Sequence, residues 1–169
     1  MSEFVQSWLL DLPSGALAIV PLLAFLEACV FVGLFVSGIF LLSAVTLLYA
    51  EGSTSLTTLA LLAFMGATLG DHIGYFLGHW GAPHLWRSRW VRRQIIKRKV
   101  GYLKFRKILS WSAPLAIVVG RLSPPIRSLS PVLAGVGGVR PLIFSLADLL
   151  ACGIWASLLA ALAYGANQI

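Results

Sequence analysis

The chain has 169 residues, of which 59% are apolar and only 11% are charged. Typical soluble domains are about 45–50% apolar even with glycine counted, and about 25% charged. The mean hydropathy of +0.89 agrees with this bias. The length suits one domain, and a soluble domain of that size cannot hide so much apolar surface. These values exclude a soluble enzyme, a nucleic-acid-binding domain and a disordered tail, and they predict an integral membrane protein.

The N-terminal part of the chain is apolar and carries no basic residue. Residues 1–15 lack a basic n-region and a cleavage site, which favours an interfacial segment on the membrane over a cleaved signal peptide. Residues 16–50 form an apolar run whose only charge is Glu27. One helix of that length would reach about 52 Å, too long for one span, and two spans would need more residues and a loop. We therefore predict a re-entrant hairpin over residues 16–50.

Residues 55–82 have the length and composition of a transmembrane helix. Glycines at every fourth position form one helical stripe, at Gly66, Gly70, Gly74 and Gly78. Such stripes let helix backbones approach closely in lipid. Asp71 and Tyr75 lie one turn apart beside this stripe. We expect both side chains to hydrogen-bond into a cavity between the two halves of the protein.

The basic residues are concentrated in one stretch after this span. Ten of the 13 lie between Arg87 and Lys107, and residues 1–86 contain none. Because short basic loops stay in the cytoplasm, residues 84–107 are predicted to be a cytoplasmic linker. Aromatic residues alternate with its charges, which is typical of a helix lying on anionic lipid. Its role in setting the topology would explain the linker equally well.

Residues 108–139 repeat the pattern of the first hairpin. Arg121 and Arg127 lie near the centre, with Pro124 and Pro125 between them. Adjacent prolines remove two backbone donors and break a helix, so we predict a second re-entrant hairpin with its tip at these prolines. Ser128 makes the tip more polar. Residues 142–165 then form the second predicted transmembrane helix.

The predicted fold is an all-α membrane protein in which hairpin, span, basic linker, hairpin and span follow in that order. The two halves share one plan but open to opposite sides of the membrane. Such an inverted repeat of re-entrant helical hairpins is typical of secondary transporters, whose broken helices meet near the bilayer midplane.

Five charged residues are predicted to lie at membrane depth: Glu27, Asp71, Arg121, Arg127 and Asp148. Each costs about 2.5–3.5 kcal/mol to insert, so such residues are functional candidates, although structural ion pairs are a serious alternative. Three acids and two arginines leave one acid over, which provides a basis for proton coupling. Arginines at a broken-helix tip suit a phosphate group. They would equally serve to neutralise Glu27 and Asp71, and both roles are compatible. Cys29 and Cys152 are expected to be buried and inert, with no metal and no cofactor.

Two blocks of this sequence resemble the DedA family of membrane proteins. The first is Gly70-Asp71-His72-Ile73-Gly74-Tyr75-Phe76-Leu77-Gly78-His79-Trp80-Gly81, and the second is Arg121-Leu122-Ser123-Pro124-Pro125-Ile126-Arg127, followed by Ala134-Gly135 and Phe144. The resemblance implies two inverted re-entrant hairpins and a multi-pass protein of the bacterial inner membrane. It also implies movement of undecaprenyl phosphate or a phospholipid, linked to protons, and eukaryotic relatives are lipid scramblases. By position, Glu27, Arg121 and Arg127 match the family's essential charged residues.

The sequence departs from that family in two places. The first hairpin reads Ser37-Gly38-Ile39 where the family has Pro-Gly followed by an acid, and His79 stands where the family has a basic residue. Asp71 or Asp148 would have to replace the missing acid, or the protein is not proton-coupled.

Alternative functions stay open. We expect substrate binding by Arg121, Arg127, Ser128 and Tyr75, and proton coupling by Glu27, Asp71 and Asp148. The alternatives are a non-transporting assembly partner for other membrane complexes and an intramembrane serine hydrolase that uses Ser37 and His72. Under any of these functions the sequence leaves a homo-oligomer open. Because Phe35 breaks the Gly-x-Ser-Gly pattern of such hydrolases, we expect no enzyme.

Overall fold

The computed structural model describes residues 13–29, 38–85, 93, 97, 99–123 and 126–168, and every regular element within them is helical. The helices are α2 (Pro13–Ala28), α3 (Gly38–Ala50), α4 (Leu56–Leu85), α6 (Lys99–Trp111), α7 (Ala113–Leu122), α8 (Ser130–Val136) and α9 (Pro141–Ala166). The all-α expectation is confirmed for this part of the chain. The predicted N-terminal interfacial segment lies outside the described residues, apart from its last three, which begin α2.

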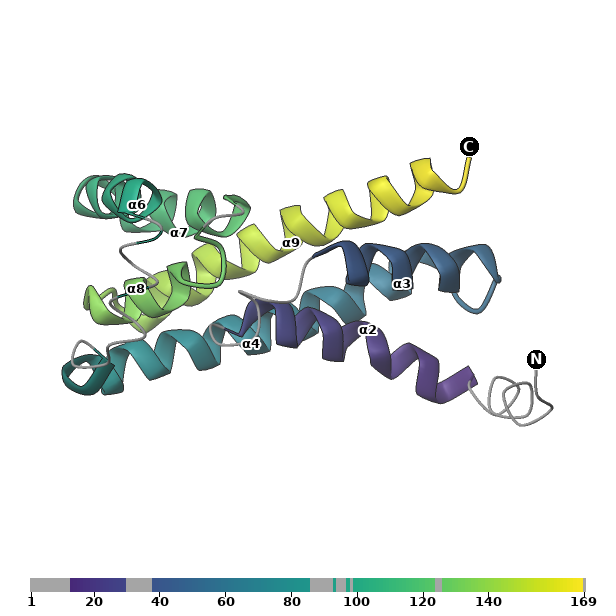
Figure 1. Ribbon diagram of the computed structural model, residues 1–169, viewed down its shortest axis with the longest axis horizontal. Coiled ribbons are helices and arrows are strands. Elements are labelled where there is room, and N and C mark those ends of the chain that lie inside the picture. Colours follow the sequence, from purple (N-terminus) through teal and green to yellow (C-terminus); the bar gives the residue numbers. More distant parts are fainter. Residues whose placement is uncertain are drawn as a thin grey trace.

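The two long helices, α4 and α9, run the length of the molecule, with the short helices gathered at opposite ends (Figure 1). The stretches Leu56–Gly81 and Pro141–Ala166 are each 26 residues long and apolar enough to cross a membrane. At 1.5 Å per residue each reaches about 39 Å, which spans a bilayer with some tilt. The predicted spans, 55–82 and 142–165, agree closely with these helices.

The short helices pair with the long ones in a repeating pattern. In the first half, α2 packs against α4 while α3 packs against α9. In the second half, α7 packs against α9 while α8 packs against α4. Exchanging α2 with α7, α3 with α8 and α4 with α9 leaves this set of contacts unchanged. That the two pairs re-enter the membrane from opposite sides stays a prediction.

The helix α4 carries three different faces in stripes four residues apart. The buried stripe consists of Leu59, Ala63, Ala67, Asp71 and Tyr75. The exposed stripe consists of large apolar residues suited to lipid, Leu61, Met65, Leu69, Ile73 and Leu77. The third stripe contains the glycines. Because both surfaces of α4 besides the lipid face are used for packing, this helix is the centre of the fold.

The glycine stripe lies where α4 touches its short neighbours. A Cβ atom on Gly66 would collide with the backbone oxygen of Pro21 in α2, and one on Gly78 with the backbone oxygen of Val132 in α8. A Cβ on Gly70 would lie 2.6 Å from that of Ala28. The stripe therefore lets α2 and α8 approach the α4 backbone closely, which is the packing mode expected in lipid.

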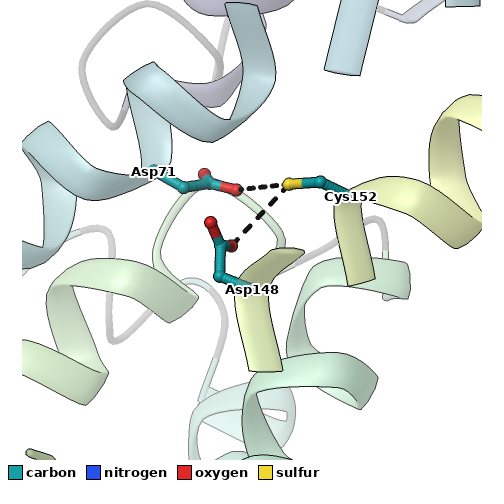
Figure 2. Close-up of side chains that lie close together, drawn as sticks. All are labelled: Asp71, Asp148 and Cys152. Carbon is teal, nitrogen blue, oxygen red and sulfur yellow. Dashed lines mark hydrogen bonds between the residues drawn. The ribbon is translucent and has the colours of Figure 1, made fainter. Parts of the chain in front are cut away.

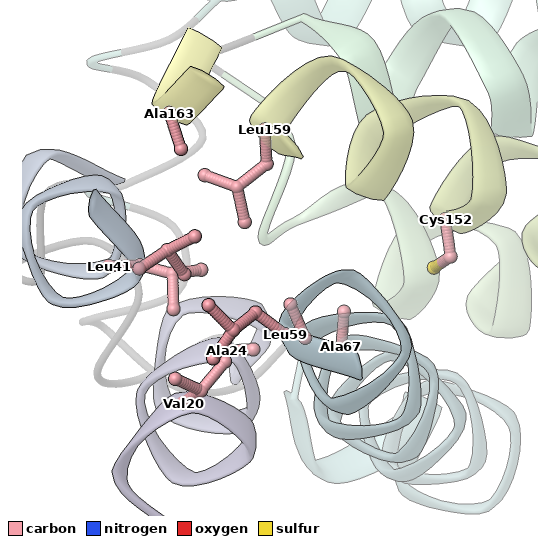
Figure 3. Close-up of a cluster of buried hydrophobic side chains, with 10 residues drawn as sticks. Val20, Ala24, Leu41, Leu59, Ala67, Cys152, Leu159 and Ala163 are labelled. Atoms are coloured by element: carbon pink, nitrogen blue, oxygen red, sulfur yellow. The ribbon is translucent and has the colours of Figure 1, made fainter. Parts of the chain in front are cut away.

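The largest buried apolar cluster lies where α2, α3, α4 and α9 meet (Figure 3). It consists of Val20, Ala24, Leu41, Val45, Leu59, Ala63, Ala67, Cys152, Leu159 and Ala163. Many of these side chains are small, so the helices approach one another at short distance.

Prolines begin helices in the second half of the molecule. Pro114, Pro131 and Pro141 lie in the first turns of α7, α8 and α9. Proline is tolerated there because the first backbone N–H groups of a helix have no partner within it. The start of the predicted second hairpin, 108–139, falls within α6, which continues to Trp111, and α7 begins at Ala113.

Of the predicted basic linker, 84–107, the structure describes His84 and Leu85 at the end of α4, then Arg93 and Lys97, and the part of α6 up to Lys107. Phe105 of α6 is buried, whereas Lys104, Arg106 and Lys107 are exposed. The helix is thus apolar on the side that packs against α7, whereas its exposed surface carries these basic residues together with Val100, Leu103 and Trp111. That it lies on the membrane surface stays a prediction.

Candidate functional site

The first ion pair of the site joins the two halves of the chain through Glu27 and Arg127. Glu27 lies in the last turn of α2, and Arg127 lies in the turn before α8. The Nη2 group of Arg127 donates a hydrogen bond to Oε1 of Glu27. The arginine side chain is 19% exposed and the carboxylate only 2%. The other carboxylate oxygen, Oε2, is buried without a hydrogen-bond partner.

Gly38 provides the space for this pair. It is the first residue of α3, and a Cβ atom there would lie 2.6 Å from Oε1 of Glu27 and 3.9 Å from Nη1 of Arg127. The glycine that survives from the family's Pro-Gly-acid pattern therefore sits directly against the ion pair. Ile39, which replaces the acid, is largely exposed.

The second ion pair also joins the two halves and is more deeply buried. Nη1 of Arg121, in the last turn of α7, lies 2.6 Å from Oδ2 of Asp71 in α4. Neither side chain is more than 3% exposed. The pair is close but not aligned as a hydrogen bond, and Nε of Arg121 and Oδ1 of Asp71 are buried without a hydrogen-bond partner. Polar atoms left unsatisfied in this way favour a further polar ligand or water.

A second acid and a thiol lie against Asp71. Figure 2 shows Asp71, Asp148 and Cys152 turned toward one another between α4 and α9. Sγ of Cys152 lies 3.6 Å from Oδ2 of Asp71 and 3.8 Å from Oδ1 of Asp148, so the thiol can donate to either carboxylate. Cys152 is buried as predicted, but its surroundings are acidic rather than purely apolar. Cys29 is only half-buried, which corrects the expectation that both thiols are buried.

His72 connects this buried group to the surface of the bundle. Its Nδ1 lies 2.9 Å from the backbone oxygen of Thr68 and 3.5 Å from Oδ2 of Asp148. Its Nε2 lies 2.9 Å from Oγ of Ser145 in α9. The imidazole is 25% exposed, in contrast to 1% for Asp148.

Trp155 of α9 lies against both arginines. The guanidinium carbon of Arg121 is 5.3 Å from the centre of its ring, and that of Arg127 is 5.9 Å away. Both distances fall within the range of a cation–π interaction. The indole therefore links the two ion pairs into one cluster.

The sequence analysis named the charged members of this cluster, as well as His72 and Cys152, but not Trp155 and Ser145. Glu27, Asp71, Arg121, Arg127 and Asp148 come together as two ion pairs and an added acid, as the sum of charges suggested. Trp155, Ser145 and the contacts of His72 were not foreseen. The sequence did contain a pattern that could have revealed the missed residues. One face of α9 carries polar or aromatic residues at intervals of three or four, namely Ser145, Asp148, Cys152 and Trp155.

Other predicted residues have different positions. Tyr75 is fully buried, its hydroxyl donates to the backbone oxygen of Val139, and its ring stacks on Phe144 at 4.3 Å. These contacts make it a packing residue in this conformation. Ser128 is buried beside Arg127. Pro124, Pro125 and Ser37 lie outside the described residues, and so does the suggested Ser37–His72 pair.

The motif glycines of the two blocks lie at one helix crossing. A Cβ atom on Gly135 of α8 would collide with the backbone oxygen of Tyr75 and would lie 2.7 Å from the amide nitrogen of His79. Gly78 makes the reciprocal approach from α4. Gly74 is buried and Gly81 half-buried. The two motif blocks, about 50 residues apart in sequence, are therefore brought together by glycine packing.

The donor atoms of the two acids and the thiol lie close enough together to hold a metal ion, but a neighbouring arginine already balances their negative charge. Donor atoms of Asp71, Asp148 and Cys152 lie within 4.8 Å of one another. A cation there would face the guanidinium of Arg121, which already neutralises Asp71 at 2.6 Å. We assign no metal ion to these residues.

Comparison with known proteins places this arrangement in a family. The family model of the VTT domain matches residues 20–165, which includes both ion pairs and both motif blocks. The chain belongs to the VTT-domain, or DedA, family. The resemblance read from the two sequence blocks is thereby confirmed. No solved structure shows a significant match to it.

The curated relatives of this DedA protein are membrane proteins. Inner membrane protein YabI of Escherichia coli is 30% identical over 155 residues, which cover 92% of this chain and 59% of the relative. An uncharacterized membrane protein of Buchnera aphidicola from Schizaphis graminum is 28% identical over 157 residues, which cover 89% of this chain and 60% of the relative. The chain thus spans about three fifths of the length of the curated relatives it matches.

Proposed function

We propose that this DedA protein moves a phosphate-bearing lipid, undecaprenyl phosphate or a phospholipid, across the bacterial inner membrane. The observation that carries this proposal is the placement of Arg121 and Arg127. They stand on either side of the α7–α8 connection, and each is paired with an acid from the other half of the chain. Arginine is suited to such a role because its planar fork matches the oxygens of a phosphate group.

The two ion pairs keep these arginines neutralised while no headgroup is bound. A buried arginine without a partner is costly, so an acid must take the place of the phosphate in the empty protein. An arriving headgroup would exchange with Glu27 at Arg127 and then use the unpartnered Nε of Arg121. Arg127 is the more exposed arginine, which supports it as the first contact.

The repeated helix contacts support a binding site between two related halves. In transporters built from inverted repeats, the substrate binds near the midplane where the broken helices of both halves meet. The pairs α2–α3 and α7–α8 are short and lie at opposite ends of α4 and α9 (Figure 1). We propose that both pairs re-enter the membrane and that residues 84–107 lie on the cytoplasmic side.

The charge balance of the cluster supports coupling to protons. Glu27, Asp71 and Asp148 bring three negative charges against two positive charges from the arginines. One proton shared by Asp71 and Asp148 makes the cluster neutral, and in a low-dielectric site neutrality is strongly favoured. These two acids would replace the acid that is absent at Ile39.

Reconstitution into liposomes with labelled undecaprenyl phosphate or phospholipid tests this function. We expect lipid movement in the unmodified protein, loss of movement in Arg127→Ala, and partial retention in Arg127→Lys. Arg140→Ala is the matched control, because Arg140 is exposed at the start of α9 and outside the cluster. Unchanged movement in correctly folded Arg127→Ala would refute the role of the cluster, and no movement of any such lipid would refute transport.

A further inference from the structure

We infer that His72 is a proton-transfer residue that delivers protons to Asp148 from the partly exposed edge of the contact between α4 and α9. This inference rests on the proposed proton coupling and names its route. The geometric basis is a line of polar groups in which Ser145, His72, Asp148, Cys152 and Asp71 follow one another.

The exposure of the side chains falls along this line. His72 is 25% exposed, Asp148 is 1% exposed, and Asp71 is fully buried. Among the described contacts of Asp148, only the one with His72 leads to a partly exposed side chain. Large apolar side chains border it on the exposed face of α4, at Leu69 and Ile73.

The two nitrogens of His72 face the two ends of the transfer. Nε2 faces Ser145, and Nδ1 faces Asp148 and the backbone oxygen of Thr68. A proton adds to Nε2 on the polar side of the ring, at Ser145, because Leu69 and Ile73 on its other side belong to the exposed apolar stripe of α4. The proton on Nδ1 leaves its hydrogen bond with the backbone oxygen of Thr68 and passes to Oδ2 of Asp148, which is 3.5 Å away and has no other hydrogen-bond partner. The ring then carries its proton on Nε2 and regains its first tautomer when that proton leaves and another binds Nδ1, so the imidazole ends neutral. One proton enters and one reaches the carboxylate, so charge balances at each step.

Protonation of the acid pair then acts on Arg121. The groups facing the pair are Arg121 from α7, Cys152 from α9, and the thiol of Cys29 after α2, which is close enough to Asp71 to feel its charge. Glu27 also acts on Arg121 electrostatically. A proton placed on the Asp71–Asp148 pair weakens the hold on Arg121 and frees this guanidinium for an anionic headgroup.

The order Ser145, His72, Asp148 is also that of a serine hydrolase triad, but the surroundings differ. Ser145 lies within α9, so its backbone N–H and that of the next residue donate to helical carbonyls. A hydrolase needs such free N–H groups to hold the oxyanion. Proton transfer requires only the side-chain contacts that are present.

Infrared difference spectroscopy of the protein in vesicles without added transport substrate tests this route. After a rapid drop in pH, the carbonyl band of a protonated carboxyl group is expected to grow, and Asp148→Asn is expected to remove it. His72→Ala is expected to slow its growth about a hundredfold, the lower range for a positioned proton-transfer group. Added imidazole is expected to restore the rate. His79→Ala is the control, since His79 is exposed two turns further along α4.

His72→Gln, which keeps a polar side chain of similar size, is a second variant in case His72→Ala folds poorly, and it should be equally slow. Growth at the unmodified rate in both variants would overturn the inference, and so would labelling of Ser145 by a fluorophosphonate that depends on His72. The measurement needs no lipid movement, so it can succeed where the proposed transport fails. The reverse result, transport with a normal proton rate in His72→Gln, would leave the proposed function and remove only this route.

Discussion

The two ion pairs of the cluster differ in how far they are closed to the outside. Arg121 and Asp71 are sealed between α7, α4 and α9, with a second acid beside them. Arg127 and Glu27 lie at the ends of short helices, and Arg127 keeps a fifth of its surface exposed. This difference is the basis on which we propose separate tasks for the two pairs, headgroup capture at the open pair of Arg127 and Glu27 and charge compensation by a proton at the closed pair of Arg121 and Asp71.

Removal of each arginine in turn gives the largest expected difference between the pairs. Arg121→Leu leaves Asp71 and Asp148 buried together without a cation, which should cost about 3–5 kcal/mol of stability. Arg127→Leu leaves only Glu27, next to a partly exposed position, and should cost clearly less. Chemical denaturation in detergent measures both. The loss in Arg121→Leu should shrink at acidic pH, because protonation removes the unpaired charges. Equal losses at all pH values would contradict the assignment of a closed and an open pair.

Substitution of a glycine in the close contact between α4 and α8 is expected to lower the stability nearly as much. Gly78→Ala places a methyl group against the backbone of α8 and should cost about 1–3 kcal/mol, since backbone cannot shift as a side chain does. Gly153→Ala in α9 has nothing within 4 Å of the added Cβ and should instead stabilise its helix by about 1 kcal/mol. Thermal unfolding compares the two variants. A stabilised Gly78→Ala protein would mean that α4 and α8 are not in close contact.

Replacement of the indole between the pairs should have a smaller effect. Trp155→Leu removes a cation–π contact with each arginine, worth about 0.5–2 kcal/mol for each depending on desolvation. We expect a modest drop in unfolding temperature and a larger drop in lipid movement, because both arginines lose a fixed neighbour. Trp111→Leu is the control, since Trp111 is 82% exposed. If the two substitutions behaved alike, Trp155 would not link the pairs.

The smallest stability effect is expected at the open pair alone. Gly38→Ala adds a methyl group 2.6 Å from Oε1 of Glu27, and the carboxylate can turn away for about 1 kcal/mol. Its hydrogen bond with Arg127 would weaken, so headgroup capture should change more than the unfolding temperature. Lipid movement and the unfolding temperature, measured on one preparation of Gly38→Ala, check this expectation. A large loss of stability with normal lipid movement would place Gly38 in packing rather than at the site.

The sequence predicted the cluster well where the cost of charge in lipid makes a residue conspicuous. Glu27, Asp71, Arg121, Arg127 and Asp148 stand out because nothing else charged occurs in the apolar segments. Which acid would meet which arginine depends on how α2 and α7 cross α4, and one-dimensional spacing does not contain that information. Only Pro124 and Pro125 were interpreted, as a helix break, and they lie outside the described residues; that Pro114, Pro131 and Pro141 each begin a helix was not predicted.

The two members that the sequence analysis missed, Trp155 and Ser145, are uncharged, and His72 was given a different partner. Trp155 and Ser145 are unremarkable residues in an apolar span, and they matter here because of their neighbours. His72 was weighed only against Ser37, since both are typical of a hydrolase. Its partners turned out to be on α9, one helix away in space and more than 70 residues away in sequence.

Side-by-side translocation of undecaprenyl phosphate and undecaprenol by the same liposomes tests the central claim most directly. The two lipids share their hydrocarbon chain and differ by the phosphate that Arg121 and Arg127 are proposed to hold. We predict that the protein moves the phosphate-bearing lipid and leaves the alcohol at the rate seen in protein-free liposomes. Movement of both lipids at the same protein-dependent rate would contradict recognition of a phosphate by the paired arginines.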